Sequence, residues 1–115
     1  MKNKTFLVER FIVHESKRIV FWKGARVHTV GNLTCSGEDH RFIVYFLEDK
    51  QYAPPSMYIP EFKLGVQFVN KTQMGSYLKL KDVEAPVYAY LDTANPDWNA
   101  LTVNEPVRQC DYVMG

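Results

Sequence analysis

The chain has 115 residues, of which 46% are hydrophobic and 23% are charged, with a formal net charge of +1. This length suits one domain with its own core, and the composition excludes a chain that is disordered throughout. No segment approaches the run of about 18 apolar residues that a membrane helix needs, and the N-terminus lacks the apolar stretch of a signal peptide. We therefore expect a single cytoplasmic domain over residues 1–115 with no membrane partner.

The charge is unevenly distributed along the chain. Residues 1–30 carry seven Lys or Arg side chains and two Glu, a formal charge of +5, whereas residues 31–115 carry −4. A basic segment on a nearly neutral protein produces a local positive field. Proteins dedicated to duplex nucleic acid are usually more basic overall, so the imbalance indicates a local contact surface or self-association.

Four strands are expected in the first half of the chain. Residues 5–14 and 17–22 are rich in β-branched and aromatic side chains, which predicts two strands paired as a hairpin. Lys23-Gly24-Ala25 then turns the chain into a third strand over 26–30, with Gly24 supplying a positive φ. Residues 31–39 are polar and predict a loop. Residues 40–47 are apolar on both faces, which predicts a central strand covered on both sides.

The second half is predicted to contain a hairpin and further short strands. Residues 48–60 contain three prolines and predict a long irregular segment. Residues 64–69 and 76–81 predict a hairpin; a helix over 72–81 with Thr72 as its N-cap competes with it, and Gly75 disfavours that helix. A strand is expected over 86–91, helical turns over 95–101, and short strands over 101–103 and 107–113. About seven short strands predict a mainly β domain, either a small antiparallel barrel or a sandwich.

The segment 17–26 places four cations around an aromatic pair. On a pleated strand Arg18 and Trp22 share a face, and Lys23 and Arg26 follow in the turn and the next strand. These four residues have the chemistry of a site that stacks bases and contacts phosphates, or of a protein-binding surface. The same pattern is typical of an edge strand whose aromatic side chains are buried and whose cations are solvated, and the residues alone do not decide between these interpretations.

Tyr88 and Tyr90 form a second candidate binding surface on one face of the strand over 86–91. Tyrosine offers a large contact area at low entropic cost, and together with Tyr77 the pair could line a groove. The alternative is an ordinary half-buried sheet face whose hydroxyl groups reach water.

Metal, redox and catalytic sites have little support in the sequence. The three histidines and Cys35 lack the closely spaced ligand pairs of a zinc site, so we expect no metal and no cofactor. Without a secretion signal, Cys35 and Cys110 are expected to be free thiols, with a disulfide between them as the alternative. The chain contains no nucleophile elbow, no phosphate-binding glycine loop and no zinc-protease helix, and its acidic pairs lie beside turns.

These observations favour a non-enzymatic binding protein. We expect a protein-interaction adaptor or inhibitor that acts through an aromatic and basic surface comprising Arg18, Trp22, Lys23, Arg26, Tyr88 and Tyr90. Its partner would be another protein or a second copy of the chain. The alternative is a single-stranded nucleic-acid-binding module that uses Arg18, Trp22, Lys23 and Arg26.

Overall fold

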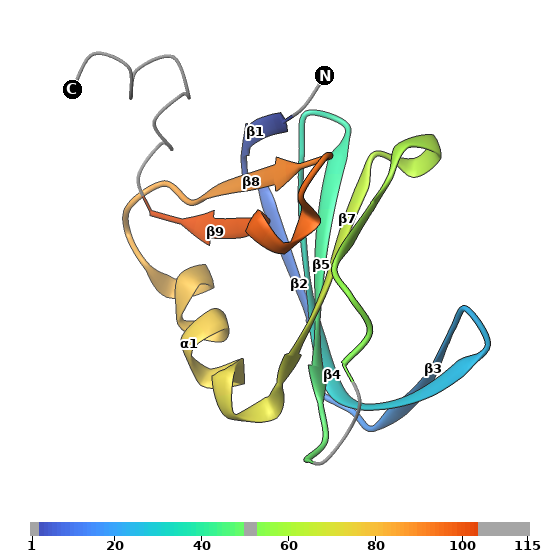
Figure 1. Ribbon diagram of the computed structural model, residues 1–115. Coiled ribbons are helices and arrows are strands. Elements are labelled where there is room, and N and C mark those ends of the chain that lie inside the picture. Colours follow the sequence, from blue (N-terminus) through green and yellow to red (C-terminus); the bar gives the residue numbers. More distant parts are fainter. Residues whose placement is uncertain (1–2, 50–52, 104–115) are drawn as a thin grey trace.

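The fold is mainly β (Figure 1). The computed structural model describes residues 3–49 and 53–103. The strands in this part of the chain are β1 (Asn3–Leu7), β2 (Arg10–His14), β3 (Arg18–Trp22), β4 (Ala25–Gly37), β5 (His40–Leu47), β6 (Met57–Ile59), β7 (Leu64–Asn70), β8 (Tyr88–Asp92) and β9 (Ala100–Thr102). The helix α1 (Met74–Leu78) lies between two 3₁₀ turns, Lys71–Gln73 and Lys79–Asp82, and further 3₁₀ turns span Pro60–Phe62 and Pro96–Trp98.

The strands form two sheets that do not close into a barrel. One sheet has the order β1-β8-β9, and the other has the order β2-β4-β5-β7-β6 with β3 paired to β4. All pairings are antiparallel except that of β5 with β7, which is parallel. The sequence-based prediction of a mainly β fold is confirmed, and the closed barrel that it offered as one form of that fold is not formed.

The predicted strand over residues 5–14 is two strands in different sheets. β1 pairs with β8 and β2 pairs with β4, and Val8 and Glu9 lie between them. At this junction the N–H of Val8 donates to the carbonyl of Val87 and the N–H of Glu9 donates to the carbonyl of Ser36. The chain thus passes from one sheet to the other without a loop, which a continuous β-type sequence cannot reveal.

β4 overturns two predictions. Residues 31–37 were expected in a polar loop, but they continue β4, and the chain turns only at Glu38 and Asp39. The expected hairpin between 5–14 and 17–22 is also wrong, because β2 and β3 both pair with β4, one after the other. Leu33 and Cys35 are fully buried, so the alternating apolar residues of this segment outweigh its turn-forming neighbours.

The predicted hairpin over 64–81 is also wrong in its second half. β7 forms as expected, but residues 71–82 are helical and lead to β8. The Asn70 side chain accepts the N–H of Thr72 at 2.9 Å and so caps the first turn, a role that the competing helix prediction gave to Thr72. Met74, Tyr77 and Leu78, spaced as on one helix face, pack against the core. No atom lies within 4 Å of the place that a Cβ at position 75 would occupy, so packing does not require Gly75.

The segment 48–60, predicted to be irregular, contains the short strand β6, which pairs with β7. The predictions for residues 86–103 hold. β8 forms with Ala89 and Leu91 buried, a 3₁₀ turn follows Asn95 with Pro96 at its start, and β9 matches the short strand predicted near 101–103. Asn95 makes no side-chain cap bond. The strand predicted over 107–113 and Cys110 lie outside the described residues. Among residues 3–49 and 53–103, no helix is long and apolar enough to cross a membrane.

Two hydrophobic clusters lie on opposite faces of the larger sheet. The main core joins both sheets and the helix, and its buried members are Phe6, Val8, Leu33, Cys35, Phe42, Val44, Phe46, Val69, Val87, Ala89 and Leu91. The second cluster consists of Val27, Leu47, Val66 and Phe68, with Trp22, Tyr45, Met57, Ile59 and Leu64 packed against it. β5 contributes to both clusters, which confirms its predicted central position between two other strands.

Candidate protein-interaction surface

The β3–β4 hairpin extends from the body of the protein as an arm, which we define as residues 17–29. In Figure 1 it projects to the lower right, away from the three-stranded sheet. β3 pairs with the first part of β4 only, so its other edge has no strand partner among the described residues. The turn at the tip contains only Lys23 and Gly24, whose φ angles of 49° and 82° are the positive values that tight hairpin turns require.

Strand register sorts the arm into two faces. Because directly opposed residues in an antiparallel pair point to the same side, Trp22 shares its face with Ala25, and Phe21 shares the other face with Arg26. The inner face carries Arg18, Val20, Trp22, Val27 and Thr29, and the outer face carries Ile19, Phe21, Arg26 and His28. The four cationic and aromatic residues predicted to form one site therefore divide between two faces.

The inner face packs onto the second cluster. The Trp22 ring lies edge-on to Phe68 with ring centroids 5.8 Å apart, and Phe68 stacks on Tyr45 at 5.3 Å. The indole Nε1 of Trp22 is buried and has no hydrogen-bond partner within the described part of the chain. Trp22 therefore anchors the arm to the sheet, the packing role that the alternative interpretation of the sequence gave it.

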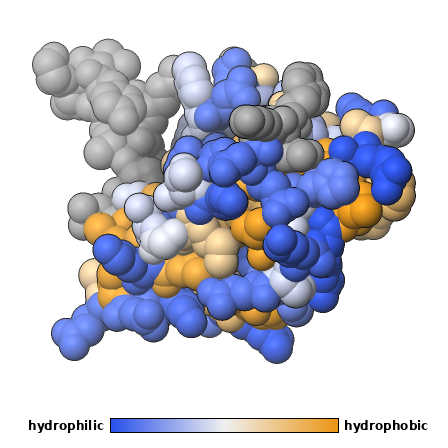
Figure 2. Space-filling view, turned by 90° about the horizontal axis from the view of Figure 1, so that it is seen from below, coloured by the Kyte–Doolittle hydropathy of each residue, from blue (hydrophilic) through white to orange (hydrophobic). Residues whose placement is uncertain are grey.

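The outer face carries the exposed aromatic side chain of the arm. Phe21 is 70% exposed and Ile19 is 42% exposed, and each has a basic or imidazole side chain as its cross-strand neighbour, Arg26 and His28 respectively. Figure 2, which views the molecule from below, shows apolar surface beside hydrophilic residues at the right-hand end, where the hairpin lies. Aromatic and Arg side chains are enriched at protein interfaces, so the outer face, with Phe21, Ile19 and Arg26, is a candidate contact surface.

The arm is positively charged along its whole length. Residues 17–28 contain four Lys or Arg side chains and no Asp or Glu. Lys17 is 3.6 Å from Glu48 but remains largely exposed, and Arg18 donates from Nε to the Ser16 hydroxyl at 3.3 Å. Burial raises the pKa of Tyr45, and the positive charge of Arg18 opposes that rise, which places Arg18 beside the rim of the second cluster. Lys23 and Arg26 are exposed at the tip.

Tyr88 and Tyr90 lie far from the arm. β8 belongs to the three-stranded sheet, at the upper left of Figure 1, and both tyrosines are half-buried on the face opposite the buried Ala89 and Leu91. The Tyr90 hydroxyl donates to Asp92 Oδ2 at 3.2 Å. Tyr77, which was expected to join them, packs instead against Phe46 in the main core, where burial raises its pKa. The tyrosine pair and the basic arm therefore cannot form one contiguous surface.

The described residues contain no group of three or more His, Cys, Asp or Glu side chains placed to hold a metal ion. Cys35 is buried in the main core, and its burial raises the pKa of the thiol from 9.0 to about 12. A thiol with so high a pKa is a poor nucleophile at neutral pH. The disulfide considered for Cys35 involves Cys110, which lies outside the described residues.

The length of the turn decides which aromatic residue lies opposite Arg26, and the sequence contains a signal for that length. Taking Lys23-Gly24-Ala25 as the turn separates Phe21 from Arg26, whereas a two-residue turn at Lys23-Gly24 makes Trp22 oppose Ala25 and Phe21 oppose Arg26. A Gly in the second position of a two-residue loop is the feature that distinguishes these alternatives.

Comparison with known proteins gives no match: no protein-family model, no curated protein and no solved structure matches this chain.

Proposed function

We propose that the protein is a non-enzymatic protein-interaction module, an adaptor or inhibitor, whose arm binds an acidic segment of another protein. The observation that carries this proposal is the exposure of Phe21 beside Arg26 on the outer face of the arm. The partner supplies carboxylates for the cations of the arm and an apolar pocket or side chain for Phe21. An extended partner segment can also pair with the unpartnered edge of β3.

Charge complementarity selects this partner class. With four cations and no acid between residues 17 and 28, the arm attracts acidic segments and repels basic ones. The aromatic ring supplies the buried anchor that usually dominates the binding energy of an interface. The arm also presents both features on a scaffold that Trp22 fixes in place, which lowers the entropic cost of binding.

A displayed library of random peptides tests the proposal directly. We expect selection on the wild-type protein to enrich peptides that combine Asp or Glu with an apolar residue. The enriched peptides should bind Phe21→Ala and Arg26→Ala at least about tenfold more weakly. Trp98→Ala is the matched control, because Trp98 is another exposed aromatic residue, 65% exposed, outside the arm. Peptides that bind the two arm variants as tightly as the wild type would refute the proposal.

A single-stranded nucleic-acid-binding module is the second candidate, because an exposed ring beside an arginine is also a stacking platform. In that site Lys23 and Arg26 contact phosphates and Phe21 takes the stacking position assigned to Trp22, whereas Arg18 lies on the inner face of the arm. Fluorescence anisotropy with labelled oligothymidine tests it. Binding that weakens steeply with salt and is lost in Phe21→Ala would favour this function over peptide binding. No binding at low ionic strength would exclude it.

A further inference from the structure

A row of three polar side chains crosses the larger sheet on the face opposite the main core. Arg10 in β2 lies opposite Ser36 in β4, and Ser36 lies opposite Arg41 in β5. The residues that follow or precede them in the same strands, Phe11, Cys35 and Phe42, face the main core. Because side chains alternate along a strand, both arginines and the serine project from the other face. The sheet register thus sets two guanidinium groups on either side of one hydroxyl.

The spacing of the row suits convergence on one small anion. Adjacent strands lie about 4.8 Å apart, so the backbones at Arg10 and Arg41 are separated by about 10 Å across Ser36. Long side chains can close that separation above the serine. Neither guanidinium makes an ion pair or a hydrogen bond with any residue in 3–49 or 53–103, and both arginines are exposed. Two unpaired cations that flank one serine repel one another, and a shared anion removes that repulsion.

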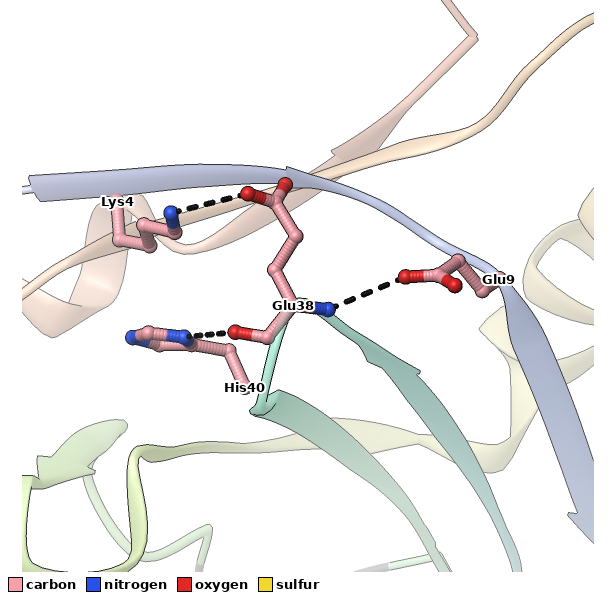
Figure 3. Close-up of polar contacts among 4 residues, drawn as sticks. All are labelled: Lys4, Glu9, Glu38 and His40. Atoms are coloured by element: carbon pink, nitrogen blue, oxygen red, sulfur yellow. Dashed lines mark hydrogen bonds and ion pairs between the residues drawn. The ribbon is translucent and has the colours of Figure 1, made fainter.

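The row forms part of an open basin of about 470 Å³, which is lined by Glu9, Arg10, Ser36, Gly37, Asp39, His40 and Arg41. The β4–β5 turn closes one end of it. Figure 3 shows three contacts that fix Glu38 in this turn. The N–H of Glu38 donates to Glu9 at 3.2 Å, its carboxylate pairs with Lys4 at 3.3 Å, and its carbonyl accepts from His40 Nδ1 at 2.9 Å.

The turn itself is conformationally strained. Glu38 and Asp39 have φ angles of 48° and 64°, in the left-handed region that a two-residue hairpin turn requires and that few residues other than glycine, asparagine and aspartate adopt. Such backbone persists only where neighbouring contacts enforce it, and it is common beside ligand sites. The turn, held by three side chains, gives the basin a fixed wall beside the two unpaired arginines.

We propose that this basin binds the phosphate group of a small phosphorylated molecule that also carries hydroxyl groups. Guanidinium groups match the geometry of phosphate oxygens and can each donate two hydrogen bonds, and the Ser36 hydroxyl supplies another donor. Glu9 and Asp39 at the rim accept hydrogen bonds from hydroxyl groups and repel further phosphates. The acidic rim therefore favours a single phosphate on a polar small molecule over a nucleic-acid strand. This site is separate from the arm and does not depend on the function proposed for it.

An NMR titration of the ¹⁵N-labelled protein tests the proposal with four probes: inorganic phosphate, ribose 5-phosphate, ribose and oligothymidine. We expect ribose 5-phosphate to shift the amide signals of residues 9–10 and 36–41, with a dissociation constant on the order of a millimolar or lower. Inorganic phosphate should bind the same residues more weakly, and ribose should not bind. Tighter binding of oligothymidine than of ribose 5-phosphate, or shifts spread over all basic regions, would overturn the proposal.

Single substitutions separate a built site from general surface charge. Arg10→Gln and Arg41→Gln should each weaken ribose 5-phosphate binding by about tenfold or more, and Ser36→Ala should weaken it less. Arg26→Gln removes the same charge from the arm and should leave the affinity unchanged. An equal loss in Arg26→Gln would show that net charge alone attracts the ligand. Intact amide spectra of the variants show that each has folded, so a lost titration reports the site.

Discussion

The two parts of β4 lie in different environments. Residues 31–37 lie between β2 and β5 and contribute Leu33 and Cys35 to the main core, whereas residues 25–29 have β3 on one side and form half of the arm. Each part ends in a two-residue turn with positive φ angles, Lys23-Gly24 at the arm and Glu38-Asp39 at the body. Only the turn of the arm contains a glycine.

This contrast shows what exposes the candidate surface of the arm. In the body, one sheet face is closed by the second sheet and the helix, so its aromatic residues are structural. In the arm, the inner face packs on the second cluster and Trp22 is half-buried there, whereas Phe21 on the outer face stays exposed. Trp22 and Phe21 differ in exposure because the inner face has the second cluster to pack on, not because the two residues differ in hydrophobicity.

The sharpest test of the contrast is one substitution made in both regions. Phe42→Ala should lower the free energy of unfolding by roughly 3–5 kcal/mol, because Phe42 is fully buried in the main core and truncation leaves a cavity. Phe21→Ala should change it by no more than about 0.5 kcal/mol, because that ring is mostly in water. Urea denaturation of the two variants measures both values. A large loss in Phe21→Ala would mean that the outer face of the arm is covered.

The burial of residues 31–37 of β4 can be tested through Cys35, by measuring protein stability at alkaline pH. Its pKa is raised to about 12 in the folded protein, so the folded state keeps this proton while the unfolded chain, with a pKa near 9.0, releases it. The folded state then binds more protons between these two values, and stability falls as pH rises through that window. The loss attributable to Cys35 reaches at most about 4 kcal/mol near pH 12.

Cys35→Ala is the control for this dependence, because burial also raises the pKa values of Tyr45 and Tyr77 and their titration adds a slope in the same direction. The difference in unfolding free energy between the wild type and this variant gives the contribution of the thiol. Unfolding free energies measured from pH 8 to 11 should fall less steeply in Cys35→Ala. Parallel curves would contradict the burial of the thiol.

The periodicity of apolar residues predicts the strands that have one regularly buried side. The alternation in 40–47 and 86–91 places β5 and β8 correctly, since each has a regular buried side. It fails where a tertiary contact decides the outcome. The helix over 71–82 depends on the Asn70 cap and on packing of Met74 and Tyr77 against the core, and the break between β1 and β2 depends on a change of sheet. The change of sheet leaves no local pattern, and the helical spacing of Met74, Tyr77 and Leu78 overlaps with the strand-like alternation of residues 76–81.

The candidate surface is predictable in composition but not in geometry. The sequence identifies a basic and aromatic segment, and it correctly places Arg18 and Trp22 on one face. Which aromatic ring is exposed depends on the second cluster, whose members Val66 and Phe68 lie about 45 residues further along the chain. The row of Arg10, Ser36 and Arg41 likewise requires the register of three strands, one of which was expected to be a loop.

Anchoring of the arm by Trp22 can be measured separately from overall stability. Phe68→Leu removes the ring contact with Trp22 and should cost about 1–2 kcal/mol. In a Trp98→Phe background, the emission of Trp22 should shift to longer wavelength as its ring gains contact with water. Phe46→Leu is the control, since Phe46 contacts Tyr77 in the main core and its loss should not change Trp22 emission. An unshifted spectrum in Phe68→Leu would mean that other contacts hold the arm.

The two turns supply the smallest and most specific test. Asp39→Gly gives the turn of the body the glycine that the turn of the arm already has, and it should raise the free energy of unfolding by about 0.5–1 kcal/mol because the left-handed backbone no longer strains a side chain. Gly24→Asp, the reverse change in the arm, should lower it by a similar amount. Thermal unfolding of both variants measures the pair. Without a gain in Asp39→Gly, the turn would carry no strain at position 39.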